Sequence, residues 1–198
     1  GSPTNTVPIA RPPKRLPRVV SGATVVTMSR PRIEAVRGDI TAERVDAIVN
    51  AANSSLMGGG GVDGAIHRAA GPRLLSACKE IRRTRWPQGL PTGEAVATDA
   101  FDLPSRWIIH TVGPNRHIGQ SDPALLRSCF TRSLQVAGEL GAASIAFPAV
   151  SAGIYGWDPA EVAQVAIDAV TTQTPEAVEL VRFVLFAQDI LDAFTAVI

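Results

Sequence analysis

Four consecutive glycines at positions 58–61 constrain this chain more than any other feature of its sequence. They follow residues 45–49, a short run rich in β-branched side chains that predicts a buried strand, and they precede residues 64–70, which predict a helix. Glycine permits positive φ and close approach of the main chain to a ligand, and a helix start offers free N–H groups. The order strand, glycine loop, helix therefore predicts an α/β fold that holds a phosphate with its main chain.

This loop matches neither of the common nucleotide-binding fingerprints. A P-loop needs Gly-Lys-Ser/Thr, and no lysine follows the glycines; a dinucleotide-binding turn needs GxGxxG directly after the strand, whereas residues 50–57 intervene here. A glycine run alone is as often a plain flexible loop. Because Asn50, Asn53 and Asp63 flank the run at a strand end, where α/β sheets place their ligands, we expect a phosphate site that belongs to neither a kinase nor a dehydrogenase.

A second loop of small residues repeats the arrangement. Residues 144–148 predict a strand, residues 149–157 form the loop, and Asp158-Pro159 then opens a predicted helix over residues 160–171. Two such loops at the carboxyl ends of strands in one sheet would form a crevice with two anion-binding cradles. That crevice suits a diphosphate.

The rest of the chain predicts one α/β domain over residues 19–198, for which its length and its 45% hydrophobic residues suffice. Further strands are expected over residues 19–28, 32–37, 94–98, 107–111 and 178–186, and helices over residues 73–83, 124–140 and 190–197. Residues 1–18 are rich in proline and arginine and predict a disordered arm, in which Gly1-Ser2 resembles a cloning remnant.

Charge and cysteine content weigh against several classes of function. The formal net charge is +1, so no global field would recruit nucleic acid or an acidic membrane. Cys78 and Cys129 form no CxxC motif, so we expect two small apolar side chains on helices and neither a zinc site nor a disulfide. No apolar run is long enough to span a bilayer, which predicts a cytoplasmic protein. We expect a monomer without a cofactor.

Three single residues each allow a structural and a functional interpretation. Asp39 ends a predicted strand, where it either caps a helical turn that begins near Thr41 or accepts a hydrogen bond from an exocyclic amine such as adenine N6. Phe186 also ends a strand and either packs into the core or stacks on a base. His110 lies in an apolar strand, where a satisfied buried polar residue is favoured over a catalytic one.

Taken together, the loops resemble the macrodomain family, in particular its MacroD-like branch of ADP-ribose-binding hydrolases. The matching motifs are NAAN at 50–53, GGGGVD at 58–63 and SAGIYG at 151–156, with GDIT at 38–41, PTGEA at 91–95 and IHTVGP at 109–114. The similarity covers residues 32–198. It implies a three-layer α/β/α sandwich with a mixed, largely parallel sheet and ADP-ribose in the crevice at the sheet edge.

The resemblance also implies a role for each matching residue. Asp39 and the Ile40 amide would bind the adenine, on which Phe186 would stack. Asn53 and Asp63 would act at the distal ribose as the catalytic residues. The diphosphate would lie between two sets of loop residues, Ser151, Ala152, Gly153, Ile154 and Tyr155 on one side and Gly59, Gly60, Gly61 and Val62 on the other.

The implied activity is removal of mono-ADP-ribose from acidic protein side chains, with deacetylation of O-acetyl-ADP-ribose by the same ester chemistry. Its partners would be ADP-ribose and mono-ADP-ribosylated proteins, and no metal is implied because neither loop carries a Cys/His ligand set. A binding module without turnover and a hydrolase of ADP-ribosylated nucleic acid are the alternatives. Asp63 either acts as a general base or, as an ionised helix N-cap, only positions groups while a substrate phosphate orients the water.

Overall fold

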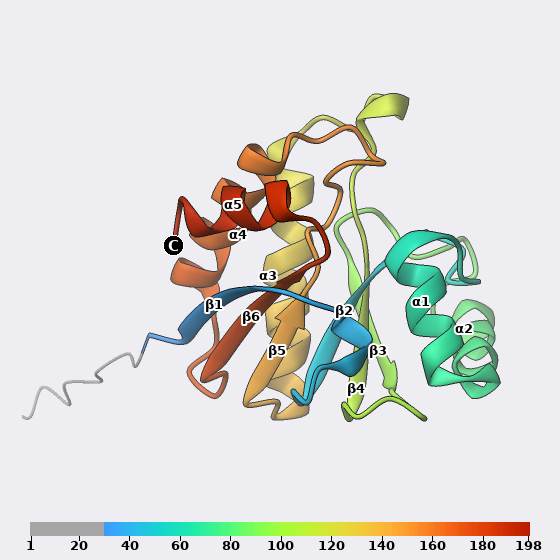
Figure 1. The fold of residues 1–198 in the computed structure, drawn as a ribbon. Helices are drawn as coiled ribbons and strands as arrows, with labels where there is room; N and C mark the ends of the chain where they lie inside the picture. Colours follow the sequence, from blue (N-terminus) through green and yellow to red (C-terminus); the bar gives the residue numbers. More distant parts are fainter. Residues whose placement is uncertain (1–29) are drawn as a thin grey trace, which may run out of the picture.

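The computed structural model describes residues 30–198, which form a six-stranded sheet between two layers of helices (Figure 1). The strand order is β1-β6-β5-β2-β4-β3, and only β3 runs antiparallel to its neighbour. The predicted α/β/α sandwich with a mixed, largely parallel sheet is therefore confirmed. The arm at 1–18 and the strand at 19–28 lie outside the described residues. The strands are β1 Arg32–Arg37, β2 Ala47–Ala52, β3 Ala95–Asp99, β4 Trp107–Val112, β5 Ser144–Phe147 and β6 Leu180–Leu185.

Side-chain alternation along the strands determines which helices cover each face of the sheet. In β2, Ala47 and Val49 point toward one core, while Ile48 and Ala52 point toward the other. The first core lies under α3 (Pro123–Leu140), α4 (Pro159–Gln173) and α5 (Gln188–Thr195). The second lies under α1 (Gly61–Ala70) and α2 (Pro72–Thr84). Two short 3₁₀ helices, η1 Ile40–Ala42 and η2 Arg116–Ile118, complete the described part of the chain.

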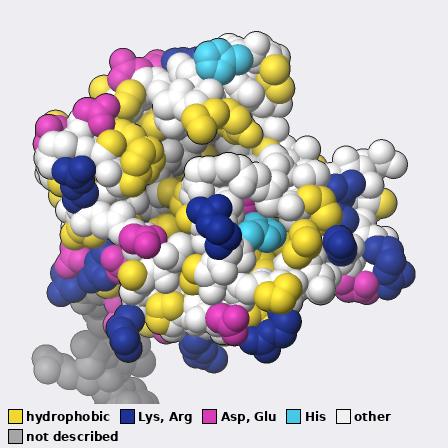
Figure 2. Space-filling model, turned by 45° about the vertical axis from the view of Figure 1, so that its right-hand side comes forward, with side chains coloured by type: hydrophobic (Ala, Val, Ile, Leu, Met, Phe, Trp, Pro, Cys, Tyr) yellow, Lys and Arg dark blue, Asp and Glu magenta, His cyan; other side chains and the backbone are white. Residues whose placement is uncertain are grey.

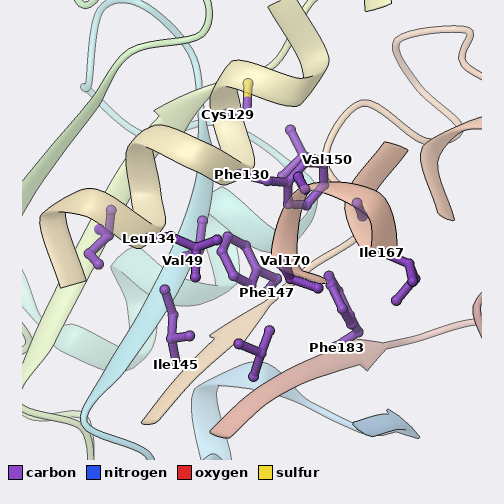
Figure 3. Close-up of a cluster of buried hydrophobic side chains, with 14 of the residues drawn as sticks. Val49, Cys129, Phe130, Leu134, Ile145, Phe147, Val150, Ile167, Val170 and Phe183 are labelled. Carbon is purple, nitrogen blue, oxygen red and sulfur yellow. The ribbon is translucent and has the colours of Figure 1, made fainter. Parts of the chain in front are cut away.

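The core under α3, α4 and α5 is built around four buried phenylalanines, three of which are labelled in Figure 3. Ring centroids lie 5.3 Å apart for Phe130 and Phe147, 5.7 Å for Phe147 and Phe183, and 4.8 Å for Phe183 and Phe194. Both cysteines are buried and free, as expected for small apolar groups. Within residues 30–198 no helix is both long and apolar enough to cross a membrane.

Two element boundaries differ from the predictions at the glycine loop. Strand β2 runs to Ala52, because its pairing with β4 continues through Asn50, which lies opposite His110. Helix α1 begins at Gly61 rather than at position 64, with Gly60 as its N-cap. The first turn of a helix has no intrahelical acceptors for its N–H groups, so the poor helix propensity of glycine does not prevent it from forming there.

Candidate functional site

Four loops lie side by side along one edge of the sheet, because β1, β6, β5 and β2 are parallel neighbours and all end there. They carry every residue to which the sequence assigned a binding or catalytic role. Asp39 and Ile40 follow β1, Phe186 follows β6, residues 151–155 follow β5, and Asn53 with residues 59–63 follows β2. In Figure 1 the β5 loop rises at the top of the molecule and the glycine loop leads into α1.

At the β1 and β6 end, Asp39 caps η1 and Phe186 faces solvent. The Asp39 carboxylate accepts hydrogen bonds from the Thr41 amide at 2.9 Å and the Thr41 hydroxyl at 2.7 Å, both through Oδ1. The side chain is exposed, so its Oδ2 remains open to a ligand. Phe186 is 78% exposed, so its predicted alternative of core packing is wrong. An exposed aromatic ring beside an exposed carboxylate is a platform on which a base could stack.

The loop after β5 is anchored to the protein by a buried side chain, and some of its main-chain N–H groups have no partner within the described residues. Buried Trp157 anchors it, with the Arg116 guanidinium 3.9 Å from the Trp157 ring centroid, and the Arg116 amide donates to the Tyr155 carbonyl at 2.9 Å. Within residues 30–198 the Ile154 and Tyr155 amides donate no hydrogen bond to a main-chain acceptor. The Asp158 carboxylate caps α4 by accepting from the Ala160 amide, in keeping with the helix start predicted at Asp158-Pro159, so the main-chain donors left free in this loop are loop amides.

The glycine loop is joined to the end of β2 by Asn53. The Asn53 side-chain amide donates to the Gly58 carbonyl at 3.0 Å, and its oxygen accepts from the Ser55 hydroxyl. Arg82 of α2 donates to the Ser55 carbonyl at 2.8 Å and so supports this loop from the other side. No side chain caps the start of α1 at Gly60. The first N–H groups of α1 therefore open toward the same edge as the β5 loop.

Asp63 is a buried carboxylate in the first turn of α1, so its predicted role as the N-cap is wrong. Its Oδ1 accepts from the Asn50 side-chain amide at 2.9 Å and lies 3.5 Å from His67 Nε2. Burial raises the pKa of Asp63, and the hydrogen bond from Asn50 and the charge of His67 oppose that rise. A carboxylate with a raised pKa is a better proton acceptor near neutral pH than the strongly ionised N-cap that the sequence suggested.

Gly59 separates the two predicted catalytic side chains. A Cβ atom added at Gly59 would lie 3.3 Å from Asp63 Oδ2 and 3.4 Å from Asn53 Nδ2. Both polar atoms therefore face the space in front of this one residue. An open hollow of about 470 Å³ adjoins the loop on its α1 and α2 side, lined by Gly58, Gly59, His67 and Arg68 among others. Figure 2 shows this side of the molecule, where hydrophobic, basic and histidine side chains gather around hollowed surface.

A buried polar chain behind Asp63 was missed from the sequence. His110 Nδ1 lies 3.1 Å from Asn50 Nδ2, and its Nε2 lies 3.0 Å from Thr98 Oγ1. His110 is fully buried, as expected of a satisfied polar residue, and burial lowers its pKa to about 3. The chain depends on the parallel register of β2 and β4, in which Asn50 and His110 are partners, so no local pattern in the sequence signals it. Within the described part of the chain, no three His, Cys, Asp or Glu side chains gather as metal ligands.

Comparison with known proteins gives consistent matches. The family model described as Macro domain matches residues 49–166. A Macro domain-containing protein of Streptomyces griseus is 59% identical over 160 residues, which are 81% of this chain and 90% of that protein. The O-acetyl-ADP-ribose deacetylase of Escherichia fergusonii is 54% identical over 141 residues, covering 71% of this chain and 78% of the relative. The solved Oceanobacillus iheyensis macrodomain with ADP superposes with a TM-score of 0.79 at 42% identity, over 85% of this chain and 90% of that one.

Proposed function

Because this chain belongs to the macrodomain family, we propose that it binds ADP-ribose and hydrolyses acyl esters on the distal ribose, O-acetyl-ADP-ribose among them. The observation that carries the proposal is the order of the loops along the sheet edge. The exposed Phe186 and Asp39 come first, the amides of residues 151–155 follow, and Asn53 with Asp63 comes last. Base, diphosphate and ribose follow one another in the same order in ADP-ribose. The relatives that are named a deacetylase or hold ADP support this assignment.

In this proposal the two ends of the ligand are bound by different means. Phe186 stacks on the adenine, Asp39 Oδ2 accepts from its amino group, and the Ile40 amide assists. The diphosphate lies between the loop amides of Gly153, Ile154 and Tyr155 and the free N–H groups at the start of α1. Burying its charge against main-chain dipoles requires no cluster of lysine or arginine, which agrees with the near-neutral net charge.

The chemistry proposed at the distal ribose is acyl transfer to water. Asn53 hydrogen-bonds a ribose hydroxyl, and Asp63 takes a proton from a water molecule that attacks the acyl carbon. The bond between the acyl carbon and the ribose oxygen then breaks, and the proton returns to that oxygen. Acetate leaves from O-acetyl-ADP-ribose. A glutamate or aspartate side chain leaves by the same step from a mono-ADP-ribosylated protein, which is the second substrate class that we propose.

Burial of Asp63 favours a hydrolase over a module that only binds ADP-ribose. The side chain is 5% exposed, and taking a carboxylate out of water destabilises the fold unless another interaction compensates. A binding module needs the amide cradles and the aromatic platform but no buried carboxylate beside the ribose. Hydrolysis explains the buried Asp63 carboxylate, because the reaction needs a proton acceptor beside the ribose.

The test is release of acetate from O-acetyl-ADP-ribose, and of ADP-ribose from a protein modified on glutamate or aspartate, both in the presence of EDTA. The Asp63→Asn variant keeps the volume and the hydrogen bond from Asn50 but cannot accept a proton. We expect it to bind ADP-ribose in calorimetry and to lose turnover by at least about 100-fold. Asp189→Asn, an exposed acid in the first turn of α5, is the matched control. Tight binding by the wild type without release of either product would refute the hydrolase, and loss of turnover in EDTA would refute metal independence.

A further inference from the structure

We propose that His110 is a positioning residue for Asp63: it holds the Asn50 amide so that its NH₂ group always faces the Asp63 carboxylate. The inference rests on the catalytic role proposed for Asp63. His110 itself lies on β4, which is between β2 and the edge strand β3, and Asn50 stands between it and Asp63. All three side chains are buried on the α1 side of the sheet.

Counting donors and acceptors fixes the proton on the His110 ring. The Asn50 NH₂ group has two hydrogens, one of which reaches Asp63 Oδ1 at 2.9 Å and the other His110 Nδ1 at 3.1 Å. Nδ1 must therefore be an acceptor, and in a neutral imidazole the proton is then on Nε2. That N–H is 3.0 Å from Thr98 Oγ1, which can accept it. Full burial keeps the ring neutral at physiological pH, since it lowers the His110 pKa to about 3.

The other end of the Asn50 amide shows that this orientation is imposed on it. Asn50 is 0% exposed, and its Oδ1 has no hydrogen-bond partner among the described residues. A buried carbonyl without a partner is unfavourable, so the amide would turn over if a better arrangement existed. Turning it over would place Oδ1 against the Asp63 carboxylate and the lone pair of His110 Nδ1. The Asp63 carboxylate and an acceptor at His110 Nδ1 therefore both disfavour the alternative orientation.

The consequence for Asp63 is that only one of its oxygens is free. Oδ1 is occupied by Asn50, while Oδ2 faces the space beside Gly59 and Asn53. The hydrogen bond from Asn50 also lowers the pKa of Asp63 against the effect of burial. The other titratable groups close to this carboxyl are His67 on α1 and Cys78 on α2, whose thiol stays neutral because burial raises its pKa to about 12. Loss of the acceptor on His110 should therefore disturb both the direction and the pKa of Asp63.

Two variants of His110 separate positioning from folding. His110→Leu removes the acceptor, whereas His110→Asn places an amide oxygen near the Nδ1 position and can accept from Asn50. We expect His110→Leu to raise the Asp63 pKa in a carboxyl ¹³C NMR titration, to shift the acid limb of the kcat profile to higher pH and to lower kcat about tenfold or more. ADP-ribose affinity should stay within about threefold of wild type, since His110 lies outside the amide cradles. His110→Asn should restore most of the pKa and of kcat.

Thr111→Val is the matched control, because Thr111 is the next residue of β4 and is equally buried but points to the opposite face. Its hydroxyl donates to the Glu94 carbonyl at 2.8 Å, so the variant loses a buried hydrogen bond without touching Asn50. We expect lower stability with an unchanged Asp63 pKa and kcat. The inference is overturned if His110→Leu behaves like Thr111→Val, or if His110→Asn is as impaired as His110→Leu.

A measurement on the wild-type protein decides the inference even if His110→Leu does not fold. The ¹⁵N shifts of the His110 imidazole should report a neutral ring with the proton on Nε2 and no titration between about pH 5 and 8. A proton on Nδ1, or titration within that range, would overturn the proposal. If the wild type binds ADP-ribose but hydrolyses neither ester, the proposed function fails, while the tautomer and the Asp63 titration still decide the role of His110.

Discussion

Replacing Gly64 with alanine should damage the site far more than the fold. Gly64 lies in α1 where the helix passes closest to the glycine loop, and a Cβ atom there would lie 2.4 Å from the Gly59 carbonyl oxygen. Ordinary contact begins near 3.4 Å, so the Gly59 peptide would have to withdraw by about 1 Å. The second close atom, Arg68 Nη1 at 3.1 Å, belongs to an exposed flexible side chain that can move away.

Two opposing contributions keep the expected change in stability small. Alanine is favoured over glycine inside a helix by up to about 1 kcal/mol, whereas overpacking typically destabilises by about 1–3 kcal/mol. The net loss should therefore be within about 2 kcal/mol. The functional loss should be larger, because Gly59 lies directly in front of Asp63 and Asn53 and a displacement of 1 Å at a reacting centre reduces turnover about 100-fold.

The assay compares urea unfolding, ADP-ribose calorimetry and O-acetyl-ADP-ribose turnover for Gly64→Ala with those of Ala69→Gly. The control changes the same helix by one methyl group at an exposed position, so it should cost about 1 kcal/mol through helix propensity and leave binding and turnover unchanged. If Gly64→Ala folds and keeps wild-type turnover, the close approach of α1 to Gly59 does not position the site and the reasoning fails.

Three further predictions follow from the same geometry. Phe186→Ala should change the free energy of unfolding by less than about 0.5 kcal/mol and weaken ADP-ribose binding by about 1–3 kcal/mol. Phe183→Ala empties a fully buried position and should destabilise the fold by about 3–5 kcal/mol. Calorimetry measures the loss of binding, and urea unfolding measures the loss of stability. Gly113→Ala places a Cβ atom 2.3 Å from Ser151 Oγ and should displace the β5 loop, which calorimetry would register as weaker ADP-ribose binding. Asp63→Asn should be more stable than wild type at pH 7, because burial raises the pKa of Asp63 in the folded state. The penalty for ionising the buried carboxyl group is absent below the unfolded-state pKa of 3.8 and is complete once the pH has risen through the folded-state pKa. Equal stabilities of the variant and the wild type at pH 7 would contradict this.

Elements with a local signal were predicted well from the sequence. Strand β1 agrees with its prediction at both ends, and α3, whose Asp122-Pro123 start is a local signal, differs only by including Pro123. The pattern of apolar residues lies within each segment, and the residue that caps α3, Asp122, directly precedes that helix. The parallel sheet edge followed from the two loops, because loops at the carboxyl ends of parallel strands have to meet.

Features that depend on pairing between distant segments could not be predicted. The link from His110 to Asn50 requires the register of β2 against β4, and the link to Asp63 requires that α1 cover that face of the sheet. The prediction for Asp63 was wrong for a local reason. Glycine has a poor helix propensity, so the sequence placed the start of α1 after Asp63, whereas the helix begins at Gly61. Burial of Asp63 raises its pKa, which is opposite to the shift that an ionised N-cap would show.

Several unfavourable features of this structure lie along the ligand edge, where the proposed chemistry takes place. Asn50 has an unpartnered buried oxygen, Asp63 is a buried carboxylate, and Ser151 holds a φ of 67°, a region that non-glycine residues seldom adopt. The buried phenylalanines of the described chain all pack on the other face, under α3, α4 and α5. A single cooperative sheet joins both faces, so the apolar side can stabilise conformations at the ligand edge that the local sequence would not keep by itself.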